Sequence, residues 1–396
     1  MIIVSDICPK IPPQYFTAKL SHNEVLQLIS KETTRLMTKN ITINSFIALL
    51  YFFVSPSVLM AQAWTKGGNS GFYKCLNLLV MQDTLNIAIA QLAPVWLNKK
   101  LTLKKIEIAV KEAISQKAQL VCFGETLLPG YPFWLELTDG ARFNATRQKE
   151  LYAHYLKEAV SIVEGDLTSI CALAKEGRIA VYIGCAERAS DRANHSVYCS
   201  LVYIDQQGVI QSVHRKLMPT YEERLAWSIG DGNGLKVHPL EAFTVGGLNC
   251  WENWMPLART TLYAQGENLH IAVWPGAERN TIDLTRHIAL ENRMYVLSVS
   301  GLMRKTDIGT DIPHHELIRQ NAPDLLSNGG SCIAAPDGSW VIAPIIDKEI
   351  VITATIDLNE VRKERQNFDP SGHYARPDVF ELTVNRQRQK IVTFIE

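Results

Sequence analysis

The sequence predicts a protein of the α/β class whose main domain follows a dissimilar N-terminal segment. From Leu85 onward, short apolar runs of strand length alternate with amphipathic segments of helix length. Alternation of this kind is typical of α/β folds. No linker or internal repeat divides this region. Of the 396 residues, 47% are hydrophobic and 20% are charged, which is the composition of a chain that buries a large core.

The first half of the domain contains the clearest alternation. We expect strands at 85–93 and 118–125, and helices at 101–116 and 146–163. The strand-like runs RIAVYIGCAER, VYCSLVYID and VIQSVHRKL come next, and the turn Gln206-Gln207-Gly208 connects the last two. Such a turn makes the two strands antiparallel, so the sequence predicts a mixed sheet.

The second half continues the same pattern. FTVGGLN and LHIAVW are expected to be strands, and helices are expected at 256–265 and 282–294. SCIAAPDGSWVI and EIVITATIDL follow as strands, with a turn at Pro336-Asp337-Gly338. A region of about 300 residues is near the upper limit for a single core, so we expect one domain over 81–370.

Residues 1–80 carry no clear amphipathic period. Within them, segment 37–63 imitates a secretory signal, because a lysine precedes the apolar run SFIALLYFFV and the small residues of AQA follow it. A genuine signal would begin near the start of the chain, so we favour an upstream extension that is dispensable for chemistry, with the working protein beginning near Met81. Export of a chain cleaved after residue 63 is the alternative. Pro56 interrupts the run, which barely reaches the roughly 20 residues that a membrane-spanning helix needs.

Charge and cysteine content restrict which binding partners and which cellular compartment we expect for the protein. The 40 Lys and Arg residues balance the 40 Asp and Glu residues, so no net charge favours nucleic acid or an anionic membrane. The eight cysteines are far apart and show neither a CxxC pair nor zinc-ligand spacing, so we expect reduced thiols and a cytoplasmic protein. We expect no metal, since His287, His314 and His315 form no ligand pattern.

Three polar residues stand at the ends of three predicted strands, where the active sites of α/β proteins gather. Glu125 closes LVCFGE, Lys216 follows VIQSVHR, and Cys250 follows FTVGGLN. Each has an ordinary explanation when taken alone: a helix cap, a solvated strand edge and a buried inert thiol. Unpaired N–H groups at the strand-to-helix turn of Cys250 would lower the pKa of its thiol.

The stretches GETLLPGYPFW, HRKLMPTYEER and GGLNCWENWMPLAR resemble, in order and spacing, the signatures of the nitrilase superfamily of carbon–nitrogen hydrolases. The resemblance implies a four-layer αββα sandwich with mixed sheets and no cofactor. It also implies that Cys250 is the nucleophile, Glu125 the general base and Lys216 the group that stabilises developing negative charge. A supporting glutamate lies seven positions after the lysine in such enzymes, which matches Glu223 rather than Glu222.

Within the superfamily, Cys-Trp-Glu-Asn followed by Met-Pro-Leu-Ala-Arg, and the tail motif GHYARPDVF, are similar to the nitrilase branch. That branch implies hydrolysis of an organic nitrile to a carboxylic acid and ammonia through a thioimidate and a thioester on the cysteine. Gly124 and Asn249 depart from the usual pattern, which leaves substrate preference open. The alternatives are an amidase, a cyanide hydratase or dihydratase that uses the same residues, and a catalytically silent, filament-forming homologue.

Aromatic residues near the three strand ends suggest a pocket for an apolar nitrile, with Tyr131, Trp251 and Trp274 as its expected walls. The sequence leaves open whether that nitrile is aliphatic, aromatic or an arylacetonitrile. The tail at 371–396 carries too many apolar residues for a free polar terminus. In similar enzymes a C-terminal segment crosses the subunit contact, so we expect a homodimer or a larger spiral homo-oligomer.

Overall fold

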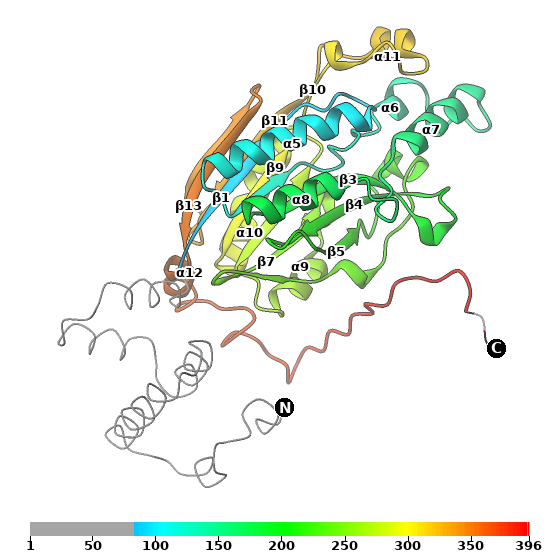
Figure 1. Ribbon diagram of the computed structural model, residues 1–396. Coiled ribbons are helices and arrows are strands. Elements are labelled where there is room, and N and C mark those ends of the chain that lie inside the picture. The colour runs from blue at the N-terminus through cyan, green and yellow to red at the C-terminus, as the bar shows by residue number, and fades with distance from the viewer. Residues whose placement is uncertain (1–82, 394, 396) are drawn as a thin grey trace, which may run out of the picture. The chain divides into compact units, whose positions relative to one another are not determined.

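The computed structural model describes residues 83–393 and 395, and its elements are drawn in Figure 1. The N-terminal segment, with its signal-like stretch, lies outside these residues. One sheet of the described part has six strands. They are β1 (Thr84–Gln91), β2 (Leu120–Phe123), β3 (Ala180–Arg188), β4 (Val197–Ile204), β5 (Ile210–Arg215) and β13 (Ile350–Asp357). Their order is β13-β1-β2-β3-β4-β5.

The second sheet has seven strands. They are β6 (His238–Leu240), β7 (Phe243–Asn249), β8 (Leu269–Trp274), β9 (Tyr295–Ser300), β10 (Leu302–Arg304), β11 (Leu325–Ala334) and β12 (Trp340–Ile346). Their order is β10-β11-β9-β8-β7-β6, and β12 pairs with β11. Strands β7, β8 and β9 run parallel, whereas β11 is antiparallel to β9. In the first sheet β1, β2 and β3 are parallel, β4 is antiparallel to β3, and β5 is antiparallel to β4. The prediction of mixed sheets is therefore confirmed.

Helices cover the outer faces of the two sheets. The α-helices of the described residues are α5 (Lys99–Ser115), α6 (Trp134–Leu137), α7 (Thr146–Glu158), α8 (Thr168–Gly177), α9 (Pro256–Tyr263), α10 (Glu278–Asn292), α11 (His315–Asn321) and α12 (Leu358–Glu364). Short 3₁₀ helices are η3 (Ser190–Arg192), η4 (Tyr221–Leu225), η5 (Gly232–Gly234), η6 (Cys250–Trp254) and η7 (Lys305–Asp307). No α-helix among the described residues is long and apolar enough to cross a membrane.

The hydrophobic core shows why these elements form four layers. Successive residues of a strand point to opposite faces, and the central strands are covered on both faces, so β2, β4 and β8 are buried along their whole length. Ile87 and Ile89 of β1 face the second sheet, where they join a core with Val273 and Leu297. Their neighbour Ala88 faces the opposite way, into the core under α5 and α8. A third core lies between β8, β9 and α10. The expected αββα sandwich is confirmed.

Of the four helices expected from the sequence, two depart furthest from their predicted bounds. The helix expected over 146–163 ends at Glu158, because Ala159 is extended and Val160 forms a bridge with Glu187 of β3. The helix expected over 282–294 begins four residues earlier and ends at Asn292, where a left-handed residue stops it. The apolar period of a helix does not reveal where the chain leaves the helix to pair with a strand, as Val160 does with β3.

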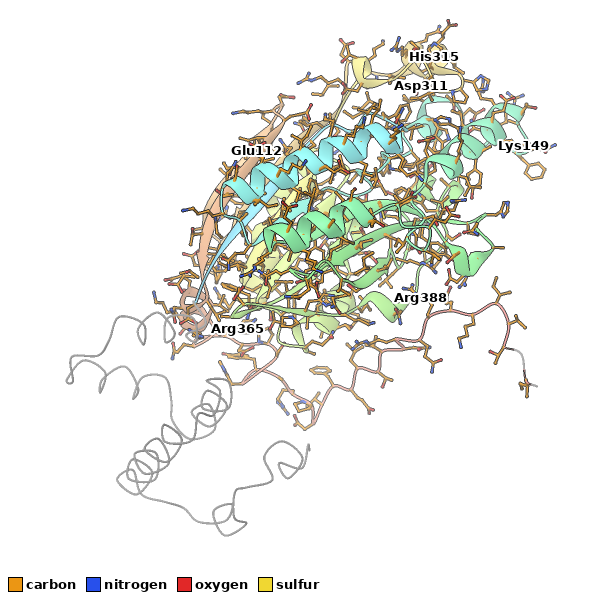
Figure 2. The ribbon with its side chains drawn as sticks, viewed as in Figure 1. Glu112, Lys149, Asp311, His315, Arg365 and Arg388 are labelled. Atoms are coloured by element: carbon orange, nitrogen blue, oxygen red, sulfur yellow. The ribbon has the colours of Figure 1, made fainter. Side chains whose placement is uncertain are left out.

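The C-terminal tail contacts the domain of its own chain near Arg388. Arg388 forms an ion pair with Asp231 at 3.0 Å and donates to the carbonyl of Val213 at 2.9 Å, and its position is labelled in Figure 2. Asn233 donates to the carbonyl of Arg386 at 3.1 Å. Before this contact the tail is largely exposed, and Phe380 keeps 77% of its surface accessible.

Candidate active site

Glu125 lies in the loop that follows β2, between the two sheets. Its main-chain N–H donates to the carbonyl of Trp274 at the end of β8, at 3.1 Å, so this loop is tied to the opposite sheet. The loop also presses against β3, where a Cβ on Gly184 would lie 2.3 Å from the carbonyl oxygen of Gly124. Only glycine allows this approach. The Glu125 side chain is thereby fixed in the interior with 2% of its surface exposed.

Lys216 follows β5 and joins two carboxylates. Its ammonium Nζ lies 3.0 Å from Oε1 of Glu125 and 2.7 Å from Oε2 of Glu223. Glu223 belongs to η4, and the main-chain N–H of Thr220 donates to its Oε2 at 2.6 Å. The hydroxyl of Tyr131 donates to the other oxygen of Glu223 at 2.8 Å. Glu223 therefore holds the lysine, whereas the neighbouring Glu222 lies at the cleft.

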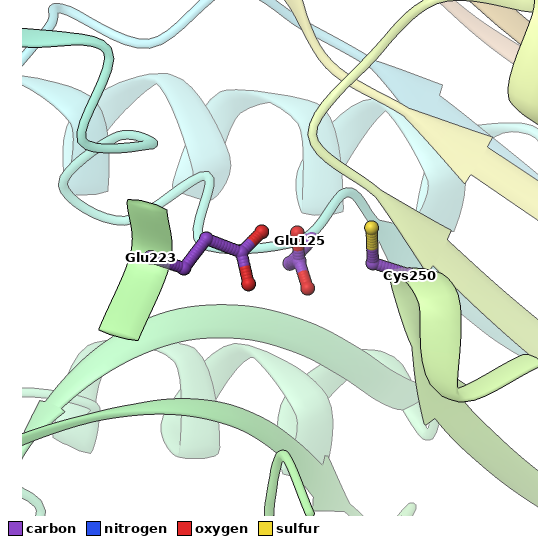
Figure 3. Close-up of side chains that lie close together, drawn as sticks. All are labelled: Glu125, Glu223 and Cys250. Carbon is purple, nitrogen blue, oxygen red and sulfur yellow. The ribbon is translucent and has the colours of Figure 1, made fainter. Parts of the chain in front are cut away.

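Cys250 is the first residue of η6, directly after β7. Its φ of 49° is in the left-handed region, which a strand-to-helix turn at a nucleophile can impose. Its sulfur and one carboxylate oxygen each of Glu125 and Glu223 lie within 4.8 Å of one another. Figure 3 shows the side chain of Glu125 between those of Glu223 and Cys250. The structure thus brings together the four side chains that the sequence singled out.

Glu252 connects the turn that carries Cys250 to the loop that follows β5. Its buried carboxylate accepts from the N–H of Asn249 at 2.9 Å and from the N–H of Leu217, and it lies 3.0 Å from Nε2 of His214. The loop after β5 and the turn before Cys250 are therefore fixed to one carboxylate. Sequence reasoning did not single out this residue. A glutamate three positions after Asn249, in the arrangement of a capping box, was the signal that could have identified it.

Burial and neighbouring groups together shift the pKa values of Glu125 and Lys216. Burial raises the pKa of Glu125 from 4.5 to about 7, although the Lys216 ammonium opposes the rise. Burial alone would lower the pKa of Lys216, but the acidic groups around it, Cys250, Glu125 and Glu223, outweigh burial and hold that pKa well above its ordinary value. At neutral pH the lysine is a cation, and Glu125 can both take up and release a proton.

Burial is the largest influence on the pKa of the Cys250 thiol. Burial raises its pKa well above the ordinary value, and the negative charge of Glu125 raises it further. The N–H of Trp251 and the Lys216 ammonium lower the pKa, but they do not offset burial. The turn therefore acts on this pKa in the expected direction, through the N–H of Trp251, but burial has the larger effect and the net pKa is raised.

A cleft of about 530 Å³ opens onto Cys250. Tyr131 and Trp251 line it, as the sequence suggested. Phe133, Trp254, Leu326 and Pro275 also line it, together with the charged residues Glu136, Glu222 and Arg279.

Trp274 does not line this cleft. Its side chain is fully buried between β8 and α10, where its indole N–H donates to the hydroxyl of Ser298 at 3.3 Å. As the last residue of β8, it points away from the sheet-to-sheet space that Val273 faces. The prediction rested on the Pro and Gly residues of the loop after β8, and these do not indicate toward which face of the sheet the last strand residue points.

Cys250, Glu125 and Glu223 offer atoms of the types that bind metal ions. The ammonium of Lys216 contacts both carboxylates, at 3.0 and 2.7 Å, and so supplies the positive charge that a cation would otherwise bring. A thiol, a proton acceptor and a fixed cation that lie close together are the groups that a covalent hydrolase requires. This site, on an αββα sandwich, has the features of the cysteine-hydrolase class.

Comparison with known sequences gives the family. A sequence model described as "Carbon-nitrogen hydrolase" matches residues 86–366. "Nitrilase 2" from an unknown prokaryotic organism is 34% identical over 311 residues, which cover 78% of this chain and 95% of the relative. "Nitrilase 2" of Arabidopsis thaliana is 33% identical, covering 81% of this chain and 94% of that relative. The chain belongs to the carbon–nitrogen hydrolase family, in its nitrilase branch.

Solved structures show the same fold. A carbon–nitrogen hydrolase from Helicobacter pylori G27 has a TM-score of 0.58 at 19% identity, covering 76% of this chain and 98% of that one. A mutant amidase from Nesterenkonia sp. AN1, with acrylamide added at its active-site cysteine, has a TM-score of 0.51 at 17% identity. That match covers 72% of this chain and 97% of the amidase.

Proposed function

We propose that this protein is a nitrilase that hydrolyses an organic nitrile to a carboxylic acid and ammonia. The observation that carries the proposal is that Cys250 lines the cleft and that its sulfur lies within 4.8 Å of a carboxylate oxygen of Glu125, which in turn contacts the Lys216 ammonium. Relatives named nitrilases, 33–34% identical over nearly their whole length, support the nitrile as the substrate.

The first half of the reaction forms a covalent thioimidate. Glu125 takes the thiol proton of Cys250 while the sulfur adds to the nitrile carbon, and one C≡N π bond breaks. Negative charge develops on the nitrogen, where the Lys216 ammonium stabilises it. The proton that Glu125 received passes to this nitrogen, so the product is R–C(=NH)–S–Cys and Glu125 is again a carboxylate. A pKa of about 7 suits Glu125 to this exchange.

The second half uses two waters. Glu125 accepts a proton from the first water, whose oxygen adds to the thioimidate carbon to give a tetrahedral intermediate. Protonation of its nitrogen and cleavage of the C–N bond release ammonia and leave a thioester. A second water then cleaves the C–S bond, releasing the acid and restoring the thiol.

An amide can leave from the same tetrahedral intermediate. If the C–S bond breaks before the C–N bond, the products are R–C(=O)NH₂ and free Cys250. A relative from Nicotiana tabacum, 32% identical over 78% of this chain and 89% of its own length, is named a bifunctional nitrilase/nitrile hydratase. Partial amide formation is therefore the second candidate activity.

The cleft favours a nitrile that carries a ring. Tyr131 and Phe133 have ring centroids 4.8 Å apart at one wall, and Trp251 and Trp254 each expose about half of their surface there. Aromatic faces give a ring more contact than a short alkyl chain. We therefore infer that aromatic and arylalkyl nitriles are turned over with a higher kcat/KM than aliphatic nitriles of similar length.

The test is a panel of aliphatic, aromatic and arylacetonitriles, with the acid, the amide and ammonia measured for each. Trapped acyl-enzyme on the Cys250 peptide, identified by mass spectrometry, would support the covalent route. Turnover of amides together with inertness toward every nitrile would instead identify an amidase. Inertness toward both classes, in folded protein, would support the silent homologue.

We further infer that the working enzyme is a homo-oligomer. The tail exposes Tyr374, Val379, Phe380 and Leu382 in the isolated chain, and such a set of apolar side chains favours burial against another subunit. Light scattering of the purified protein tests this, and a monomeric mass at micromolar concentration would contradict it.

A further inference from the structure

A second thiol contacts the catalytic base from inside the protein. Cys199 lies on β4 with none of its surface exposed, and its Sγ donates to Oε1 of Glu125 at 3.3 Å. The carbonyl of the same residue accepts from the N–H of Lys216 at 2.8 Å. Cys199 therefore touches the base through its side chain and the lysine through its backbone. Unlike Cys250, it is not among the residues that line the cleft, so it is not placed to act as a nucleophile.

The two oxygens of Glu125 have different surroundings. Oε1 accepts from both the Lys216 ammonium, at 3.0 Å, and the Cys199 thiol. Oε2 is buried and has no partner among the described residues. A carboxylate with two donors on one oxygen cannot rotate freely, so its other oxygen keeps a fixed direction. That free oxygen is the one available to take a proton from Cys250 or from water.

We propose that Cys199 is a positioning residue for the hydrolysis, whose S–H···O bond holds Glu125 so that Oε2 serves as the catalytic base. The proposal rests on the proposed function. A thiol suits this role because it is a weak donor. It orients the carboxylate while leaving it basic, whereas a second cation in this place would reduce its basicity.

The charge around Glu125 sets the expected direction of a pH effect. The groups that face it are Lys216 after β5, Glu223 in η4, Cys250 in η6, the phenols of Tyr131 and Tyr155, and Cys199 on β4. Among these, the Cys199 hydrogen bond and the Lys216 ammonium lower the pKa of Glu125, against the larger effect of burial. Loss of the thiol donor should therefore raise this pKa. Because the base must be ionised, the acid limb of the kcat/KM profile should move to higher pH.

The experiment compares Cys199→Ala, Cys199→Ser and the control Cys185→Ala. Cys185 is an equally buried thiol on the neighbouring strand β3, and it packs in the core beneath the helices. We expect Cys199→Ala to lower kcat about tenfold, the effect of one lost hydrogen bond in the transition state, and to move the acid limb to higher pH. Cys199→Ser, which keeps a hydrogen-bond donor, should retain most of the wild-type kcat and the wild-type position of the acid limb. Cys185→Ala should change thermal stability without moving the limb.

A second readout separates this proposal from the proposed function. The rate at which iodoacetamide alkylates Cys250, followed by peptide mass spectrometry across pH, reports the coupled thiol and carboxyl titration without any nitrile. A shift to higher pH in Cys199→Ala, but not in Cys185→Ala, supports the positioning role even if no nitrile is turned over. An unshifted alkylation profile in folded Cys199→Ala overturns it, as does an equal shift in Cys185→Ala.

Discussion

Replacing Lys216 with methionine tests the charge balance of the site most directly. The lysine is fully buried between two buried carboxylates, so Lys216→Met keeps the volume of the side chain but leaves Glu125 and Glu223 without their cation. Removing one partner from a buried ion pair typically costs about 3–5 kcal/mol. We therefore expect the free energy of unfolding at pH 8 to fall by that amount and turnover to be abolished.

The loss should depend on pH, with a sign fixed by linkage. The Lys216 ammonium lowers the pKa of Glu125 in wild type, so without it the pKa of this carboxyl in the folded state rises further above its unfolded value. A group with a raised folded pKa contributes stability that is present below the unfolded value and is lost as pH rises through the folded value. Wild type already has this sign at Glu125, whose pKa is about 7. The stability difference between wild type and Lys216→Met should thus be smaller at pH 5.5 than at pH 8.

Urea unfolding at both pH values measures this difference, and Lys105→Met is the matched control. Lys105 forms an ion pair with Glu349 at 2.8 Å, with 32% and 45% of the side chains exposed. Such a surface pair contributes about 0–1 kcal/mol, so its removal should have little effect at either pH. A loss below about 1 kcal/mol in Lys216→Met, or a loss equal at both pH values, would refute the reasoning.

Three further predictions concern the nucleophile, the supporting glutamate and the tail. Cys250→Ala should abolish turnover and the acyl adduct while circular dichroism shows a folded protein. Residual activity above a trace would show that Cys250 is not the nucleophile. Glu223→Gln should lower kcat far more than Glu222→Gln, since only the former contacts the lysine, and steady-state kinetics showing the reverse order would contradict this. Removing everything after Asp369 should lower both the mass seen by light scattering and the activity. If the contact of Arg388 with Asp231 and with β5 supports the site, Arg388→Ala should lower the activity without changing the mass. Unchanged mass and turnover in both variants would mean that the tail contributes neither to assembly nor to activity.

The resting site also shows how the nucleophile is controlled. Desolvation raises the pKa of the Cys250 thiol, and it also raises the pKa of Glu125 to about 7. Glu125 and Cys250 each raise the pKa of a shared neighbour, Tyr131, and the charge of Glu125 raises that of Cys250. The base and the thiol consequently titrate together, and a pH profile will report the pair rather than either residue.

The sequence by itself determined the α/β class, the mixed sheets and the identity of Glu125, Lys216, Cys250 and Glu223 as candidates. It could do so because strand periodicity is local and because Glu125, Lys216 and Cys250 each fall at the end of an apolar run, whereas Glu223 followed from the family resemblance. The three motifs then related those ends to a known family. The domain and site residues were therefore available before any distance was known.

Only the tertiary structure decided which side chains share a surface. It removed Trp274 from the cleft, because strand register turns that indole toward α10. It added Cys199 and Glu252, whose partners are 74 and 35 residues away in the chain. It also showed that burial outweighs the turn in setting the pKa of Cys250, since desolvation depends on everything packed around the thiol and not on the turn that carries it. Contacts and burial are non-local sums over the fold, and no local pattern of residues contains them.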